Sequence, residues 1–223
     1  MKLRKIRGHH VRVDILDRES IIVDAGAHRG EFSSDLHKLT GCRCLLIEAN
    51  PDLAAKLRQL QLGPVINAAL TTSDGETVLA VRENLEASSI FPRSNYGPET
   101  TVTIRKISLV SVLEELGSDH IDLLKLDIEG AEFELLGQTP SHVLRKIKQI
   151  TVEFHDFLAG FGDRHLVRQT YSRLRSLGFV YAVMSFRTRG DVLFLNLDHN
   201  RLSIVEKVRF RHLARFKSRL FQG

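Results

Sequence analysis

The chain has few cysteines, few aromatic residues and no long hydrophobic run. Of its 223 residues only 7% are aromatic and two are cysteines, Cys42 and Cys44, which stand one residue apart in an apolar segment. Such close neighbours bridge poorly and are too few for a disulfide framework, so we expect a reducing, cytoplasmic compartment. No segment approaches the roughly 18 apolar residues that span a bilayer. We therefore expect a soluble protein.

Acidic residues are nearly missing from the end of the chain. From Arg201 to Gly223 there are seven Lys or Arg residues and one acid, Glu206, a net charge of +6. The whole chain carries +5, so the body carries −1. A body of this charge has no basic field of the size that nucleic acid requires, and no nucleic-acid partner is expected.

The same tail has apolar residues at near-helical spacing between its basic ones, which predicts a basic amphipathic helix. Such a helix suits contact with an anionic membrane surface at the periphery, or contact with a partner. Packing on its own body or on a dimer mate is the alternative.

The rest of the chain has no repeat, no low-complexity tract and no linker-like segment, so one domain over 1–200 followed by the tail 201–223 is expected. Short β-branched or leucine-rich runs predict buried strands at 20–26, 42–50, 64–70, 121–130 and 147–155. Helical spacing marks the segments 31–40, 50–61, 109–117, 132–139 and 163–178. This alternation predicts an α/β fold with a doubly wound, mostly parallel sheet.

The C-terminal part of the body breaks this alternation. Two apolar runs, 179–186 and 191–197, flank a short turn-rich connection. Strands joined so closely must be antiparallel. An antiparallel hairpin is therefore expected to close the sheet.

The first predicted strand runs into a turn, DAGAHRG at 24–30, with glycines four positions apart. In open α/β sheets, ligands bind beyond the carboxyl ends of the strands. Gly26 would let the backbone approach a ligand, and Gly30 would let the following helix pack close to the strand. The turn lacks the middle glycine of the dinucleotide fingerprint, and Asp24 suits a ligand with an amino group. A tight turn without a ligand is the alternative.

Two further strand ends carry candidate cofactor contacts. Glu48 lies about 20 residues beyond the glycine turn, where a carboxylate can accept hydrogen bonds from both ribose hydroxyls of an adenosine. Its other reading is a cap for the helix that begins at Pro51, but Asn50 is the better N-cap. At the third strand, Asn67, Ala68 and Ala69 would leave room for a flat adenine.

The fourth and fifth strands end in charged residues. Because alternate residues of a strand share a face, we expect Lys125, Asp127 and Glu129 to line one side of the strand 121–130. Glu153 and His155 would likewise share a face of the next strand. The four acidic and imidazole groups could serve as a general base, as a clamp for hydroxyls, or as a Mg²⁺ or Mn²⁺ site. Ordinary ion pairing and a surface position for His155 are the alternatives.

The segments VDAGAHRGEF, IEANP, NAAL, DLLKLDIEGAEFELL and VEFH resemble, in order and spacing, the FkbM-type S-adenosylmethionine-dependent methyltransferases. The resemblance runs from about Ile21 to His155. It implies a Rossmann-like class I methyltransferase fold of seven strands and O-methylation of a hydroxyl on a sugar, glycolipid or secondary metabolite. Two departures from the family pattern are Ala49 in place of proline and His28-Arg29 in place of smaller or neutral residues.

The resemblance also implies roles for single residues. The turn would hold the methionine end of S-adenosylmethionine, Glu48 its ribose, and the segment 67–69 its adenine. The candidate cofactor-binding residues are Asp24, Gly26, Ala27, His28, Gly30, Phe32, Glu48, Ala49, Asn50, Asn67, Ala68, Ala69 and Asp127. The candidate catalytic residues are Lys125, Asp127, Glu129, Glu153 and His155, with Asp127 or His155 as the base.

These observations predict a methyltransferase that acts on a small-molecule or glycan acceptor, with a divalent metal as an optional addition. Residues 87–100 would form a lid over the acceptor or a plain surface loop. Rival functions are an NAD-dependent oxidoreductase, disfavoured by the missing glycine, and a non-catalytic nucleotide-binding module that acts through its basic tail.

Overall fold

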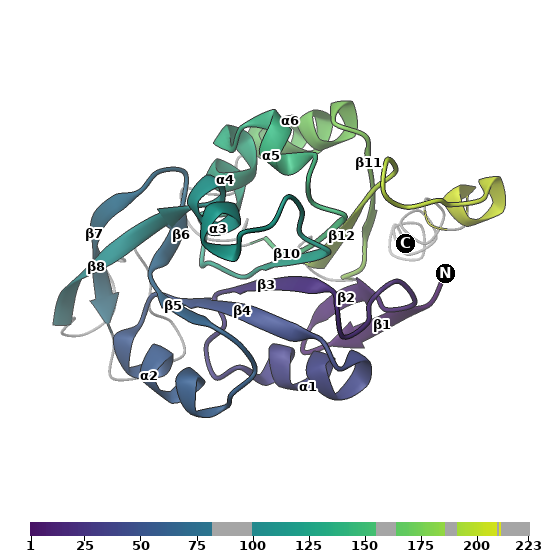
Figure 1. The fold of residues 1–223 in the computed structure, drawn as a ribbon. Coiled ribbons are helices and arrows are strands. Elements are labelled where there is room, and N and C mark those ends of the chain that lie inside the picture. Colours follow the sequence, from purple (N-terminus) through teal and green to yellow (C-terminus); the bar gives the residue numbers. More distant parts are fainter. Residues whose placement is uncertain (82–99, 155–163, 186–190, 209, 211–223) are drawn as a thin grey trace, which may run out of the picture.

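The structure is a computed structural model that describes residues 1–81, 100–154, 164–185, 191–208 and 210 (Figure 1). Its central sheet has seven strands in the order β11-β12-β10-β9-β3-β4-β5. These strands are β3 (Ile21–Ala25), β4 (Arg43–Glu48), β5 (Val65–Asn67), β9 (Leu123–Leu126), β10 (Gln149–Glu153), β11 (Phe179–Val183) and β12 (Asp191–Asn196). All neighbours pair in parallel except β12, which is antiparallel to both β10 and β11. The predicted mostly parallel sheet with its C-terminal hairpin is confirmed.

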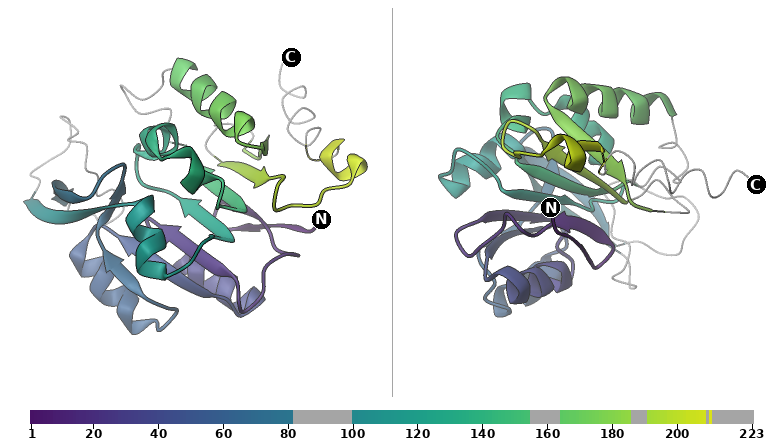
Figure 2. Two further views of the ribbon diagram at one scale, coloured as in Figure 1. Left: turned by 45° about the horizontal axis from the view of Figure 1, so that its top comes forward. Right: turned by 90° about the vertical axis from the view of Figure 1, so that its right-hand side faces the viewer.

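Helices cover both faces of this sheet (Figures 1 and 2). One face carries α1 (Glu31–Thr40) and α2 (Pro51–Gln59), and the other carries α3 (Leu109–Leu116), α4 (Glu132–Gln138), α5 (Ser141–Leu144) and α6 (Arg164–Ser176). Leu36 and Leu57 pack with Ile22 on the first face, and Val112 and Leu174 belong to the larger core on the second. As predicted, Asn50 caps α2, since its side chain accepts hydrogen bonds from the amides of Asp52 and Leu53.

The N-terminal residues form a hairpin that the sequence analysis did not predict. Strands β1 (Leu3–Ile6) and β2 (His9–Arg12) pair antiparallel. The amide of Arg12 donates to Gln149 Oε1 at 3.0 Å, and Gln149 Nε2 donates to the Arg12 carbonyl at 3.1 Å. His10 Nδ1 lies 2.5 Å from Asp191 Oδ2. The hairpin therefore lies over β10 and β12, on the face that also carries α1.

The third predicted strand, 64–70, is wrong as a single element. The chain bends at Ala68, directly after Asn67, which is the last residue of β5 to pair with β4. Residues beyond that point form β6 (Ala69–Thr71), which joins β7 (Gly75–Val81) and β8 (Thr100–Ser108) in a separate three-stranded sheet. The predicted lid falls outside the described residues apart from Thr100, which begins β8.

No helix among these described ranges is both long enough and apolar enough to cross a membrane. Cys42 and Cys44 are both buried and unbridged. Residues 204–208 of the tail are helical, but most of the tail lies outside the described residues. The amphipathic tail helix and the boundary between 1–200 and 201–223 therefore stay predictions.

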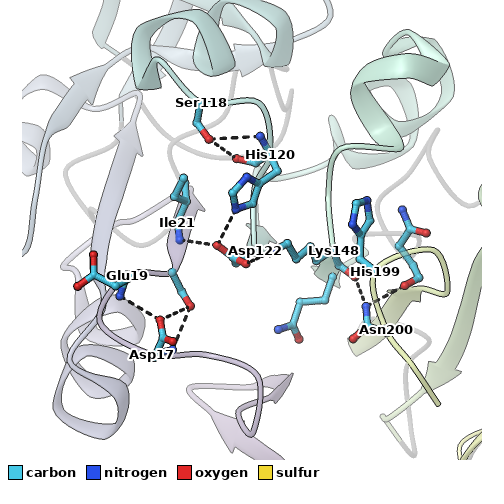
Figure 3. A network of polar contacts seen from close by, with 12 residues as sticks. Asp17, Glu19, Ile21, Ser118, His120, Asp122, Lys148, His199 and Asn200 are labelled. Carbon is cyan, nitrogen blue, oxygen red and sulfur yellow. Dashed lines mark hydrogen bonds and ion pairs between the residues drawn. The ribbon is translucent and has the colours of Figure 1, made fainter. Parts of the chain in front are cut away.

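A polar network holds the amino ends of the central strands together (Figure 3). The buried carboxylate of Asp122, just before β9, accepts a hydrogen bond from the Ile21 amide at 2.7 Å and pairs with Lys148 Nζ at 2.7 Å. His120 Nε2 lies 3.4 Å from the same carboxylate. This network joins the entrances of β3, β9 and β10 at the edge of the sheet opposite to the strand ends where ligands bind in such folds.

Candidate active site

A buried polar row crosses the sheet beneath the N-terminal hairpin. The register pairs Lys125 with Asp24 on one side and with Thr151 on the other. Lys125 Nζ lies 3.2 Å from Asp24 Oδ1 and donates to the Gly26 carbonyl at 2.7 Å. Burial lowers the pKa of Lys125, but the carboxylates of Asp24 and Asp127 outweigh burial and the pKa is raised. Lys125 is therefore charged, and its ammonium group supports the glycine turn through the Gly26 carbonyl.

Asp24 lies at the bottom of this arrangement and is completely buried. Its second oxygen, Oδ2, accepts a hydrogen bond from Ser33 Oγ at 2.6 Å, so both oxygens face protein groups. This geometry lets Asp24 fix Lys125 and the start of α1. Its predicted contact with the methionine end of the cofactor stays a prediction.

The glycine turn itself is formed as the sequence predicts, but its glycines have different neighbours. Gly26 has a φ of 73°, and a methyl group added there would overlap the carbonyl oxygen of Asp127. Gly30, also at 73°, would place a methyl group 2.6 Å from Leu60 and 2.8 Å from Leu57. Gly26 therefore lets the turn approach the backbone just after β9, and Gly30 lets the turn approach the C-terminal part of α2. Ala27 and Phe32 are buried, and Arg29 is exposed.

Glu48 closes the turn from the end of β4. Its Oε2 accepts a hydrogen bond from the His28 amide at 2.7 Å, and its Oε1 accepts one from the Asn50 amide at 2.8 Å. Burial raises the pKa of Glu48, against these hydrogen bonds. His28 has a positive φ of 51° within this turn. The backbone of His28 thus has a role that the sequence alone did not reveal.

The predicted adenine segment lies beside Glu48 at the end of β5. Asn67 Nδ2 donates to the carbonyls of Glu48 and Ala49, at 2.8 and 3.0 Å. Ala68 and Ala69 are buried, Ala69 within the second sheet. The Asn67 side chain therefore holds the small residues Ala68 and Ala69 next to the end of β4.

The expectation that Lys125, Asp127 and Glu129 share one strand face is wrong, because β9 ends at Leu126. The following residues turn, with a φ of 55° at Glu129 and 111° at Gly130. The completely buried carboxylate of Glu132 stabilises this turn by accepting hydrogen bonds from the amides of Ile128 and Gly130. Lys125 and Asp127 nevertheless remain close, with 3.6 Å between Nζ and Oδ2.

Three ligand-bearing groups converge beyond the ends of β9 and β10. His9, Asp127 and Glu153 each offer one nitrogen or oxygen, and these atoms lie within 4.8 Å of one another. The cluster contains two of the predicted catalytic residues, Asp127 and Glu153. Glu129 is not a member of it, and His155 lies outside the described residues.

Sequence reasoning missed two residues of this region, His9 and Glu132. His9 comes from the hairpin, more than 100 residues away along the chain, and is 2% exposed. The available signal was a histidine pair inside a short apolar-alternating segment, which does not reveal its distant partner. Glu132 could have been found as an acidic residue in the first turn of a predicted helix.

The strand order, the single antiparallel strand and the acidic carboxyl edge define a Rossmann-like class I methyltransferase fold. The comparisons with known proteins give the family. The model of the methyltransferase FkbM domain matches residues 24–181, more than half of the chain. The chain therefore belongs to the FkbM family of S-adenosylmethionine-dependent methyltransferases.

Two curated relatives match over part of their length. The 31-O-demethyl-FK506 methyltransferase FkbM of Streptomyces tacrolimicus is 28% identical over 149 residues, which are 66% of this chain and 49% of that protein. The AMB antimetabolite synthetase AmbE of Pseudomonas aeruginosa is 44% identical over 48 residues, 22% of this chain and 2% of that protein. The chain thus spans about half of the first relative and a small fraction of the second.

Solved structures align more distantly. Monomeric WbdD gives a TM-score of 0.47 at 11% identity, over 82% of this chain and 37% of that chain. A SAM-dependent methyltransferase from Archaeoglobus fulgidus gives a TM-score of 0.40 at 15% identity, over 91% of this chain and 80% of that chain.

Proposed function

We propose that the chain transfers a methyl group from S-adenosylmethionine to a hydroxyl oxygen of a sugar, a glycolipid or a secondary metabolite. The observation that carries this proposal is the convergence of Asp127, Glu153 and His9 at the carboxyl edge, next to the Glu48-bound turn. The name of the Streptomyces relative, a methyltransferase of 31-O-demethyl-FK506, supports transfer to oxygen.

The cofactor fits the hydrogen-bonding capacity left at Glu48. A carboxylate has about four acceptor positions, and two of those on Glu48 are used by backbone amides. Two remain, which matches the two hydroxyls of a ribose. Turn residues 24–30 would hold the methionine end, and 67–69 would border the adenine.

The cofactor, when bound, supplies a methyl group on a sulfonium, whose sulfur leaves as a neutral thioether. The protein is left to position the acceptor and to remove its proton. Asp127, half-buried and beside the Lys125 ammonium, is the proposed base for the acceptor hydroxyl, and His155 is the alternative. Lys125 is a positioning residue, since it holds the turn carbonyls and the Asp127 carboxylate in one place.

Binding of the cofactor is the first test. S-adenosylmethionine should raise the melting temperature, and NAD should not, because the turn lacks the glycine that a pyrophosphate needs. Glu48→Gln should weaken the Kd for S-adenosylmethionine roughly tenfold to hundredfold, the value of about 1.5–3 kcal/mol for hydrogen bonds to a charged group. A thermal unfolding scan measures the change in melting temperature, and calorimetric titration measures the Kd.

Glu76→Gln is the matched control, since Glu76 is exposed on β7. It should bind S-adenosylmethionine as the wild type does. Unchanged affinity in Glu48→Gln would remove the proposed ribose contact. Stabilisation by NAD in place of S-adenosylmethionine would favour the oxidoreductase.

The setting of the reaction is also a proposal. We place the protein in the cytoplasm, with the basic tail 201–223 as a peripheral contact to anionic lipid, or as part of a dimer interface. Co-sedimentation with anionic vesicles, compared between the full chain and a chain ending at Asn200, tests the membrane contact.

A further inference from the structure

The geometry points to a divalent-cation site formed by His9, Asp127 and Glu153, beside the end of β9. Each residue offers one ligand atom, and the three atoms lie within 4.8 Å of one another, close enough for one ion to reach all of them. They come from three elements: the hairpin, the turn after β9, and β10. The fold therefore assembles the set from parts of the chain that are far apart in sequence.

The buried imidazole is the observation that separates this cluster from a group of surface acids. His9 is 2% exposed, and its Nδ1 lies 3.5 Å from the hydroxyl of the completely buried Thr151. Its Nε2 points toward the carboxylates, 3.8 Å from Asp127 Oδ2, which is longer than a hydrogen bond. An imidazole held through one nitrogen, with the other aimed at carboxylates, is the usual arrangement of a metal-binding histidine.

The charge of the region also calls for a cation. Lys125 is shared between Asp24 and Asp127, at 3.2 and 3.6 Å. In the described parts of the chain, no hydrogen bond or ion pair from a cationic side chain reaches Glu153. A bound divalent cation would compensate the carboxylates of Asp127 and Glu153, with the Nε2 of His9 facing Asp127 as the third ligand atom.

The ligand set selects the class of ion. Carboxylates suit Mg²⁺ and Mn²⁺, whereas imidazole suits transition metals. One imidazole with two carboxylates therefore favours Mn²⁺ over Mg²⁺. Three protein ligands leave open positions for water or for an acceptor oxygen.

A role for the ion rests on the proposed function, although its binding does not. At this position the ion would hold the acceptor hydroxyl, and the Asp127 oxygen that is not a ligand would remain to accept its proton. The open coordination positions would then set the orientation of the acceptor, while Glu48 and the turn hold the cofactor independently.

Mn²⁺ binding to the full chain, freed of metal with a chelator and then titrated, tests the inference by electron paramagnetic resonance of free Mn²⁺. One ion should bind per chain. Glu153→Gln, which keeps the side-chain size, should weaken the Kd at least about tenfold, and His9→Gln should do the same. His142→Gln is the matched control: it changes an exposed histidine of α5, which is not part of the cluster, and should keep the wild-type affinity.

Thr151→Val provides a second variant that keeps all three ligands. Loss of its hydroxyl should weaken Mn²⁺ binding about tenfold or more by releasing the His9 ring. No stoichiometric Mn²⁺ binding to the wild type, or equal binding to wild type, Glu153→Gln and His9→Gln, would overturn the inference. Absence of S-adenosylmethionine binding alongside intact Mn²⁺ binding would instead refute the proposed function and leave the cation site standing.

Discussion

At the scale of single residues, the candidate site depends on backbone groups placed by a few special conformations. Glu48 and Glu132 are both buried carboxylates that accept hydrogen bonds from backbone amides: Glu48 from His28 of the glycine turn and from Asn50, and Glu132 from the turn after β9. Each turn also contains a non-glycine residue with positive φ, His28 in one and Glu129 in the other. Buried acids thus stabilise two strained turns whose ends meet where Gly26 faces the Asp127 carbonyl.

Gly26→Ala tests that meeting point. An added methyl group would overlap the Asp127 carbonyl and would also need a φ of 73°, so we expect a loss of about 3 kcal/mol or more in the free energy of unfolding. Gly117→Ala is the matched control, because Gly117 has a φ of 59° but nothing within 4 Å of the added atom. It should cost only about 1 kcal/mol. Equal losses in urea unfolding would show that the close approach contributes nothing.

At the scale of elements, the N-terminal hairpin contributes His9 to the candidate active site. β2 runs across the face of β10, with Arg12 at Gln149 and Gly8 near Glu153. Between them, the hairpin brings His9 over Thr151 and places its ring edge-on to Phe32, at 5.6 Å between ring centroids. The position of His9 therefore depends on the contacts that hold the hairpin to the sheet, namely the two hydrogen bonds between Arg12 and Gln149 and the contact of His10 with Asp191.

Replacing that glutamine should loosen the hairpin. Gln149 is completely buried, so Gln149→Met leaves the amide and carbonyl of Arg12 without partners, and we expect a loss of about 2–4 kcal/mol in stability. Faster amide exchange over residues 9–12, measured by hydrogen–deuterium exchange, would report the loosening. Gln138→Met changes an exposed glutamine and should leave both quantities unchanged. Protection of 9–12 at the wild-type level in Gln149→Met would contradict this role.

The elements also show what the sequence could predict. The strands of the central sheet were found because buried parallel strands are continuous apolar runs, such as Ile21–Ala25 and Arg43–Glu48. The hairpin β1–β2 was missed because its strands have four residues each and derive their position from Gln149 and Asp191, far along the chain. The end of β9 was misplaced because Glu132, beyond the strand, decides where the chain turns.

The same distinction applies to the candidate site. Glu48, Asp127 and Glu153 follow apolar strands directly, so local pattern was sufficient to select them. His9 could not be selected in this way, because its proximity to Asp127 is created by packing of the hairpin on the sheet. Local pattern therefore identifies the carboxylates, and only the tertiary structure identifies the imidazole that completes the cluster.

At the scale of the whole molecule, the polar groups of the sheet lie in two separate places, at the carboxyl ends and at the amino ends of its strands. The carboxyl edge carries an excess of acids around Lys125, whereas the amino edge carries the Asp122 network, in which a lysine and a histidine surround the carboxylate (Figure 3). At the carboxyl ends, the acidic groups outnumber the one lysine, so negative charge remains for a ligand to compensate. The network at the amino ends satisfies its charge internally and joins the entrances of three strands, which is what a purely structural network requires.

Asp122→Asn should therefore separate stability from ligand binding. The substitution keeps the side-chain shape but removes the charge that pairs with Lys148, and we expect a loss of about 1–3 kcal/mol in the free energy of unfolding. Asp119→Asn, at a 91% exposed side chain beside the same His120, should cost less than about 0.5 kcal/mol. Both variants should bind S-adenosylmethionine and Mn²⁺ with affinities close to wild type in calorimetric titration, because the ligands are assigned to the opposite edge. Weakened binding in folded Asp122→Asn, but not in Asp119→Asn, would mean that the strand entrances set the geometry of the site across the length of the sheet.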